Sequence, residues 1–374
     1  MVIQSRKIVI FAALNADLPP HSPGKGRQKH PKGVHFTMKK ITSTTLKIAI
    51  PLLISAVVLY YTYRDYDFSQ FWTDLGSIKW GWLIAALSFS ALGPLFRGLR
   101  WNLLLEPIGY NVPKKDTVLT VFTGYAANII IPRVGEICRC GMLEQNAGVP
   151  FSKGLGTLVA ERVVDAVLLG LIVVAGICIS WNEFQLLLTP TDADLAAPVA
   201  ESIPLLQNPK FWFWTIGIIL FIAFCWWACV KFRLWDKVKN FIQGFWEGFM
   251  SLKQIKRLPL FLAYSVGIWL CYYFELYLAF YCLPSTAAVG PIGGLACFAA
   301  SSVAVLVPTP NGAGPWNLAI VKMLEIYGAK TNEAQIMSFV LHFCQTMIYL
   351  LCGLIAWIAL KIIHRDGRKA STIS

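Results

Sequence analysis

Apolar residues occur along most of this chain in long uninterrupted runs, the pattern of helices that cross a membrane. A helix needs about 20 residues to span the hydrocarbon core, and seven runs approach or exceed that length. They cover residues 46–63, 80–96, 157–180, 211–230, 258–283, 286–307 and 334–361. The pattern therefore predicts an all-α, polytopic membrane helix bundle with seven or eight membrane segments.

Two shorter apolar runs, 117–131 and 315–328, each lie beside a stretch rich in proline and glycine, at 132–135 and 308–315. Irregular backbone survives in hydrocarbon only where protein buries it or where it lines a wet cavity. Paired interruptions of this kind also mark transporters built from inverted repeats, which bind substrate at the broken helices. We therefore expect two broken or re-entrant helices, with 117–150 as a hairpin. Whether the two halves of the chain form an inverted repeat stays open.

Charges between the apolar runs predict the orientation. Lys and Arg are scarce in 63–79 and 181–210, but frequent in 97–115, in 231–257 and in the tail after Lys361. Because cytoplasmic loops are enriched in these residues, we expect the basic loops and both termini in the cytoplasm. Apolar residues at helical spacing within 231–257 predict a helix lying on the membrane surface.

Composition agrees with a membrane protein and excludes a soluble enzyme. Of 374 residues, 56% are hydrophobic and only 14% are charged, against about 25% charged in soluble domains. The net charge of +13 comes with no basic stripe outside the apolar runs, so no nucleic-acid partner is expected. The sequence predicts a disordered basic leader over residues 1–37 and a single membrane domain over residues 38–374. Met38 resembles a translation start, so whether the leader is expressed stays open.

Ionisable side chains at membrane depth cost at least about 2.5 kcal/mol each, so they need partners or a wet cavity. The densest group comprises Glu136, Arg139, Glu161, Arg162 and Asp165. On a helix, Glu161 and Asp165 share a face, and Arg162 reaches Asp165 at three-residue spacing. Two interpretations stay open. One is an internally neutral salt-bridge cluster, and the other is a phosphate site in which Arg133, Arg139 and Arg162 bind the anion and the carboxylates orient them.

Glu275 stands alone inside the run 258–283. It is either a protonated, hydrogen-bonded carboxyl, or a site for a coupling proton or a cationic headgroup. Asparagines beside the two breaks complete the candidate headgroup site, which consists of Arg133, Glu136, Arg139, Glu161, Arg162, Asp165, Asn128, Asn311, Asn317 and Glu275. Metalloprotease, hydrolase and P-loop motifs are missing, so the sequence predicts no catalytic residue, no metal and no other cofactor.

Several short motifs resemble a known family. They are Pro132-Arg133-Val134-Gly135-Glu136-Ile137-Cys138-Arg139, Gly148-Val149-Pro150-Phe151-Ser152 and Glu161-Arg162-Val163-Val164-Asp165. These are similar to the P-G-x-x-G-E-x-x-R, G-x-x-x-S and E-R-x-x-D patterns of the transmembrane domain of lysylphosphatidylglycerol synthases, a flippase-like integral membrane family. The stretch from Pro308 to Asn317 is similar to its P-x-P-G-G-x-G-x-x-E signature, and the resemblance covers about residues 40–362. Arg133 departs from the family's small residue, and Asn317 from its acid.

The resemblance implies a bilayer domain that moves or presents a phospholipid, joined in some members to a soluble domain that aminoacylates phosphatidylglycerol. We expect no such transferase domain here, because the chain ends at Ser374, soon after the last apolar run. The leading hypothesis is a transporter that binds a phospholipid or polyprenyl-phosphate headgroup between the broken helices and flips it. The alternatives are a membrane-embedded lipid-modifying transferase or its lipid-presenting subunit, and a scaffold for partner helices. A second copy of the chain and a separate lipid-modifying enzyme are the candidate protein partners.

Overall fold

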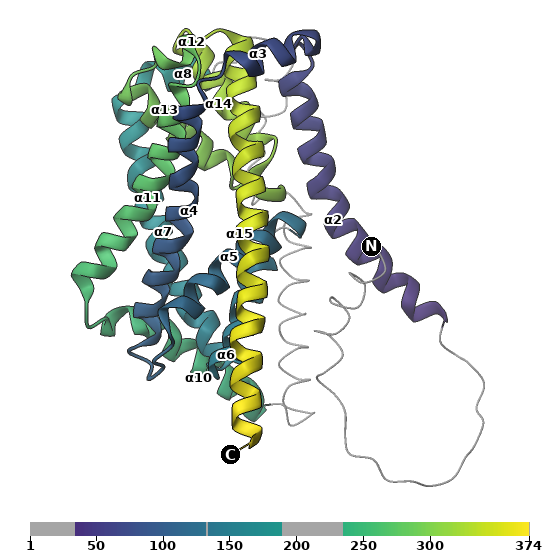
Figure 1. Ribbon diagram of the computed structural model, residues 1–374, viewed down its shortest axis with the longest axis vertical. Helices are drawn as coiled ribbons and strands as arrows, with labels where there is room; N and C mark the ends of the chain where they lie inside the picture. Colours follow the sequence, from purple (N-terminus) through teal and green to yellow (C-terminus); the bar gives the residue numbers. More distant parts are fainter. Residues whose placement is uncertain (1–33, 132–133, 189–234, 374) are drawn as a thin grey trace, which may run out of the picture. The chain divides into compact units, whose positions relative to one another are not determined.

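The computed structural model describes residues 34–131, 134–188 and 235–373, and every regular element in these ranges is a helix (Figure 1). Residues 1–46 and 47–374 form separate units. The helices are α2 (Val34–Tyr63), η1 (Phe68–Gln70), α3 (Phe71–Ser77), α4 (Trp80–Leu105), α5 (Lys114–Ile130), α6 (Val134–Ala147), α7 (Phe151–Ile179), α8 (Trp181–Leu188), α10 (Trp235–Met250), η3 (Ser251–Gln254), α11 (Leu258–Phe280), α12 (Pro284–Ala287), α13 (Pro291–Ala304), η4 (Pro310–Gly312), α14 (Pro315–Ile326) and α15 (Thr331–Ile373). The predicted leader 1–37, apart from its last four residues, and the predicted span 211–230 lie outside the described ranges.

Four of these helices are long and apolar enough to cross a membrane: α4, α7, α11 and the part of α15 up to His364. Shorter apolar helices cover Ala49–Tyr63 and Pro291–Ala304. The chain is therefore an all-helical, multi-pass membrane protein, as its apolar pattern predicts. Within this bundle α4 packs along α11, and α15 packs along α5 (Figure 1).

Two predicted spans differ from the helices observed. The first apolar run after α3 ends at residue 96, but α4 continues to Leu105 and carries Arg97 and Arg100 inside the helix. The predicted span 286–307 is replaced by α13, which has only 14 residues. Pro291 stands in the first turn of α13, where its missing N–H costs nothing, and the helix ends before the irregular segment that leads to η4.

The predicted hairpin is present as α5 and α6, which follow one another in the chain and pack against each other. Asn128, near the end of α5, accepts a hydrogen bond of 2.6 Å from the backbone N–H of Gly135 at the start of α6. A Cβ at Gly135 would overlap the carbonyl oxygen of Gly124, so this close approach of the two helices requires glycine.

The second break joins α13 to α14 through η4. Asn311 and Gly314 both have positive φ angles, of 52° and 95°. Asn is one of the few side chains that tolerate this conformation, and glycine has no Cβ to clash. The residue types at this break therefore fit the turn that separates the two short helices.

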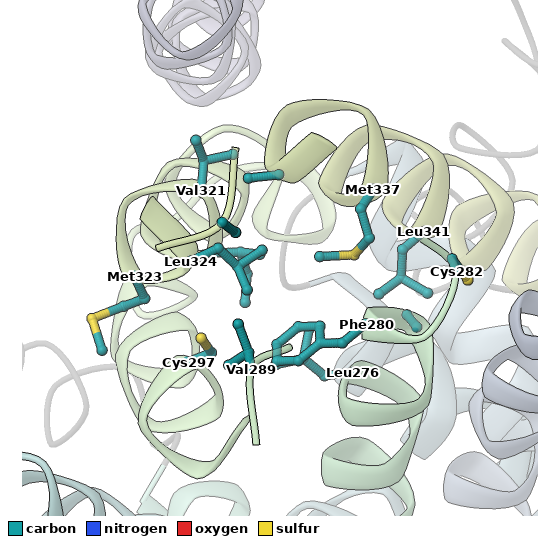
Figure 2. Packing of buried hydrophobic residues seen from close by; sticks show 14 of the residues in the cluster. Leu276, Phe280, Cys282, Val289, Cys297, Val321, Met323, Leu324, Met337 and Leu341 are labelled. Atoms are coloured by element: carbon teal, nitrogen blue, oxygen red, sulfur yellow. The ribbon is translucent and has the colours of Figure 1, made fainter. Parts of the chain in front are cut away.

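Two apolar clusters lie toward opposite ends of α4 and α11. One includes Leu83 on α4 and Leu276 on α11. Figure 2 shows Leu276 among residues of α13, α14 and α15 from this cluster. The other is built around Trp101 on α4 and Phe261 on α11. The stretches of α4 and α11 between the two clusters carry the buried polar residues described below.

Helix α7 separates apolar from charged residues. Val163, Val167 and Leu171 are exposed by 43%, 59% and 63%, whereas Glu161 and Asp165 are buried. On a membrane-length helix, exposed valine and leucine side chains are stable when they face lipid, whereas charged side chains are stable when they face the bundle interior. The burial pattern of α7 is therefore that of a membrane-spanning helix with a polar inner face.

The helix predicted within 231–257 is present as α10, which packs against the start of α7. Lys153 of α7 forms an ion pair of 2.7 Å with Glu247 of α10. The hydrogen bond from this lysine lowers the pKa of Glu247 below its usual range. Phe241 and Trp246 remain exposed on α10, as expected for a helix that dips its apolar side into the membrane surface.

Candidate functional site

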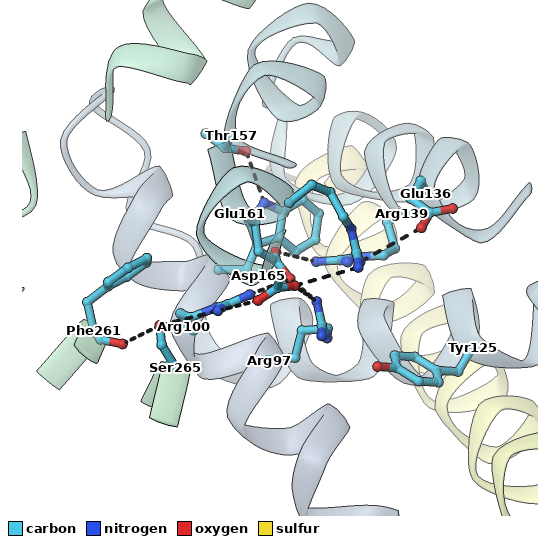
Figure 3. A network of polar contacts seen from close by, with 12 residues as sticks. Arg97, Arg100, Tyr125, Glu136, Arg139, Thr157, Glu161, Asp165, Phe261 and Ser265 are labelled. Atoms are coloured by element: carbon cyan, nitrogen blue, oxygen red, sulfur yellow. Dashed lines mark hydrogen bonds and ion pairs between the residues drawn. The ribbon is translucent and has the colours of Figure 1, made fainter. Parts of the chain in front are cut away.

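A buried ion-pair cluster joins three helices at the centre of the candidate site (Figure 3). Glu161 of α7 accepts contacts from Arg97 and Arg100 of α4, at 2.7 and 3.1 Å, and from Arg139 of α6 at 3.1 Å. Asp165, one turn further along α7, contacts Arg97 at 2.6 Å and Arg100 at 2.7 Å. All five residues are less than 9% exposed, so these charges depend on one another for compensation.

The surroundings of the cluster fix the arginines in place. Arg100 donates a hydrogen bond of 3.2 Å to the hydroxyl of Ser265 on α11. The guanidinium of Arg139 lies 4.3 Å above the ring of Trp101, a cation–π contact. Trp101 in turn donates a hydrogen bond of 3.0 Å to Thr157 on α7. The arginines are thus held by rigid helices on every side rather than by loops.

Three guanidinium groups face only two carboxylates in this buried cluster, which leaves one formal positive charge in excess. Arg162 and Glu136 extend the cluster at its more exposed rim and add one charge of each sign. Arg162 lies 3.6 Å from Asp165 and 3.8 Å from Glu136. The excess charge of the whole set therefore remains +1, and the buried arginines are not fully neutralised by protein.

A cavity of about 430 Å³ opens beside this cluster. Its wall includes Arg97, Arg139 and Arg162, whereas Arg100 is absent from it. Both helix breaks contribute, through Asn128 of the first and Asn311 of the second. Aromatic side chains cover much of the remaining wall, and they are Tyr125, Trp269, Tyr272, Phe298, Trp316 and Tyr349. The volume lies in the range of small-ligand sites.

Eight of the ten predicted site residues are brought together here. Arg139, Arg162, Glu136, Asn128, Asn311 and Glu275 line the cavity, and Glu161 holds its arginines in position from behind, as does Asp165, the eighth. Arg133 lies outside the described residues. Arg139 and Arg162 were predicted to share the phosphate site with Arg133, and in the described structure Arg97 lies on the cavity wall with these two.

Asn317 is the predicted site residue that lies away from the cavity wall. It is 2% exposed, and its side chain accepts a hydrogen bond from the backbone N–H of Gly314 and donates to Ser338. It also lies 3.1 Å from the Nδ1 atom of His342. These contacts fix α14 to α15 and close the second break, so the geometry of Asn317 is that of a structural residue.

Glu275 lies apart from the arginines on the same cavity wall. Its carboxyl accepts a hydrogen bond from the hydroxyl of Ser90 on α4, and the side chain of Gln345 on α15 also hydrogen-bonds it. Ser90 precedes Arg97 by seven residues on α4, so the acid and the arginines are separated by about 10 Å along that helix. The cavity therefore has a basic end and an acidic end.

Arg97 and Arg100 are the site residues that sequence reasoning missed. They follow the apolar run 80–96 directly, and a hydropathy count assigns them to a loop. A signal was available in their three-residue spacing, which places both on one face of a continued helix. Only the carboxylates of α7 make that continuation favourable, and these lie more than 60 residues away in sequence.

Comparison with known proteins assigns the chain to a family. A search of curated proteins and a search of solved structures each return no match. A family model described as the lysylphosphatidylglycerol synthase TM region matches residues 48–353, a range that contains the ion-pair cluster, the cavity and both helix breaks. This chain therefore belongs to the family of lysylphosphatidylglycerol synthase transmembrane regions.

Proposed function

We propose that this protein binds a phospholipid, or a related lipid phosphate, by its headgroup and moves it between the leaflets of the bacterial cytoplasmic membrane. Family membership supports a role in lipid metabolism or lipid movement. The distribution of Lys and Arg supports cytoplasmic termini, with the basic loops on the same side. The expected partners are membrane lipids, together with a second copy of the chain or a separate lipid-modifying enzyme, and no nucleic acid.

The observation that carries this proposal is the excess positive charge at the cavity wall. A buried guanidinium without a counter-charge is costly in a low-dielectric interior. Arg97 and Arg139 reach the cavity from within the cluster, and Arg162 reaches it from the rim. A lipid phosphate carries one negative charge and accepts the paired hydrogen bonds that guanidinium groups offer. Binding such a headgroup would bring the site to neutrality.

Movement of the headgroup follows from the position of the helix breaks. The α5–α6 hairpin and the α13–α14 pair both border the cavity, through Asn128 and Asn311. Elements joined by short irregular segments can tilt with little change inside each helix. Rocking one pair against the other would expose the headgroup to alternate sides while the acyl tails stay in lipid.

The test uses purified protein in liposomes with labelled phosphatidylglycerol, and follows the leaflet in which the label is accessible to an added quencher. Arg162→Gln is the informative variant, because Arg162 lines the cavity while 42% of its side chain is exposed, so folding tolerates the change. Loss of one charge-assisted contact to phosphate, worth about 1.5–3 kcal/mol, lowers the rate at least about tenfold.

Lys256→Gln is the matched control, since Lys256 is 68% exposed, pairs with Glu106 and lies outside the cavity. Its rate should equal that of the unmodified protein. No acceleration over empty liposomes for any of several headgroups would refute the proposal. A new lipid species that appears only when protein is present would favour the transferase alternative instead.

A further inference from the structure

Glu275 is a buried carboxyl without a cationic partner. It is 3% exposed, and no Lys, Arg or His among the described residues lies within ion-pair distance of it. The other three buried carboxyls of the described residues each face a basic group: Glu161 and Asp165 contact arginines, and Asp116 lies 3.3 Å from His364. The function proposed above uses the arginine end of the cavity and gives Glu275 no role.

Neutral groups surround this carboxyl on each helix that packs around it. Ser90 approaches from α4, Gln345 and Tyr349 from α15, and Cys271 lies one turn away on α11 itself. The titratable His342 of α15 also lines the cavity, and its Nδ1 atom lies 3.1 Å from Asn317 rather than against Glu275. Helix α13 contributes Phe298 and Ser301 to the same cavity, and neither carries a charge. The charged residues of α7 lie at the level of the arginine cluster.

An ionised carboxylate at membrane depth is strongly disfavoured in such surroundings, so Glu275 ionises only when the cavity opens to water. Ionised Glu275 and a phosphate at the arginines would be like charges on one cavity wall, about 10 Å apart along α4 by helix rise. At that distance, inside a protein, the repulsion is large enough to alter binding several-fold. Proton binding at Glu275 and anion binding at the arginines therefore favour each other, and the effect is reciprocal.

We propose that Glu275 is a proton-binding site through which one proton moves together with one anionic lipid headgroup. This inference rests on the lipid movement proposed above. On one side of the membrane the carboxylate takes up a proton and forms an O–H bond as the phosphate binds at the arginines. After the cavity opens to the other side the phosphate leaves, the O–H bond breaks, and the proton is released there.

The advantage of this coupling is electrical. A lipid with one negative charge that crosses alone moves that charge through the membrane potential, and a proton carried with it cancels the charge. Hydroxyl groups bridge part of the way between the two sites: the hydroxyls of Tyr125 and Tyr272 lie 2.6 Å apart on the cavity wall. They supply hydrogen-bonding positions between the acid and the arginines.

The experiment imposes a gradient of one pH unit across liposomes that contain the full chain and labelled phosphatidylglycerol. Coupling of one proton to one lipid predicts about tenfold enrichment of the label in one leaflet at equilibrium, because one pH unit corresponds to a tenfold concentration ratio. Glu275→Gln should still equilibrate the lipid but produce equal leaflets. Glu325→Gln, which removes an acid paired with Lys322 outside the cavity, should keep the full enrichment.

Infrared spectroscopy of the purified protein gives a readout that does not depend on transport. The carbonyl band of a protonated carboxyl should be present at neutral pH and disappear in Glu275→Gln but not in Glu325→Gln. Equal gradient responses of Glu275→Gln and the unmodified protein, or no such band, would overturn the inference. If the unmodified protein equilibrates lipid without responding to the gradient, coupling is wrong and transport stands. If no lipid moves at all, the proposed function fails and coupling fails with it.

Discussion

Replacing Glu161 by glutamine tests whether the buried cluster is held together by mutual charge compensation. Glu161 is fully buried and makes three of the five ion-pair contacts among the five buried residues, one to each arginine. Glutamine has nearly the same shape but no charge. The substitution therefore raises the formal excess from one positive charge to two, with only Asp165 left as counter-charge.

The expected cost follows from other buried ion pairs. Removing one partner of such a pair typically destabilises a protein by about 3–5 kcal/mol, because the remaining charge is left buried without compensation. For a chain of this size that loss corresponds to a melting temperature lower by about 4–6 °C. The assay is thermal aggregation of detergent-solubilised protein, followed by size-exclusion chromatography with fluorescence detection.

Two further variants make this measurement decisive. Asp65→Asn breaks an ion pair with Arg64 in which the carboxylate is 76% exposed, and it should leave the melting temperature unchanged. Arg100→Met combined with Glu161→Gln restores an excess of one charge without touching the cavity wall, and it should recover part of the lost stability. A melting temperature for Glu161→Gln equal to that of the unmodified protein would refute the compensation argument.

Two more predictions concern the elements that frame the site. Asn317→Ala leaves the N–H of Gly314 without its acceptor and removes the donor to Ser338. The free energy of unfolding should therefore fall by about 2–4 kcal/mol, which is measured as a lower melting temperature. An unchanged melting temperature would show that other contacts hold the second break. Glu247, whose pKa is lowered by Lys153, stabilises the docking of α10 above the usual glutamate pKa, and this contribution is lost as the pH falls through the lowered value. The protection of α10 amides against hydrogen exchange, measured relative to the intrinsic exchange rate at each pH, should therefore fall as the pH drops below the usual pKa of glutamate, and in Glu247→Gln it should not change there.

Hydropathy and spacing were sufficient to predict several parts of the structure. Apolar run length identified α4, α7, α11 and α15 as membrane helices, because lipid requires about 20 apolar residues in sequence. Proline and glycine located both helix breaks, since each residue type restricts or frees the backbone locally. The four-residue spacing of Glu161 and Asp165 placed both carboxylates on one face of α7, where they meet the same arginines.

The composition of the site was decided by packing between distant segments. Arg97 and Arg100 read as loop residues by themselves, yet they lie within α4 because carboxylates of α7 compensate their charges. Asn317 stands beside a helix break like Asn311, but only Asn311 reaches the cavity. Whether a buried polar group faces a partner or an open cavity depends on side chains brought from other helices, and sequence spacing carries no information on that.

The sequence alone thus determined that this chain is a membrane protein. It also determined the positions of the helix breaks and the acidic residues that share one helix face, because each of these is a property of neighbouring residues. Tertiary structure alone decided which arginines the acids compensate and that three guanidinium groups share two carboxylates. It also decided that Glu275 hydrogen-bonds Ser90 and forms no ion pair with these arginines. The physical reason is desolvation: a charge is tolerated inside a bilayer only when a partner, a proton or water offsets its burial, and the fold selects which of these is present.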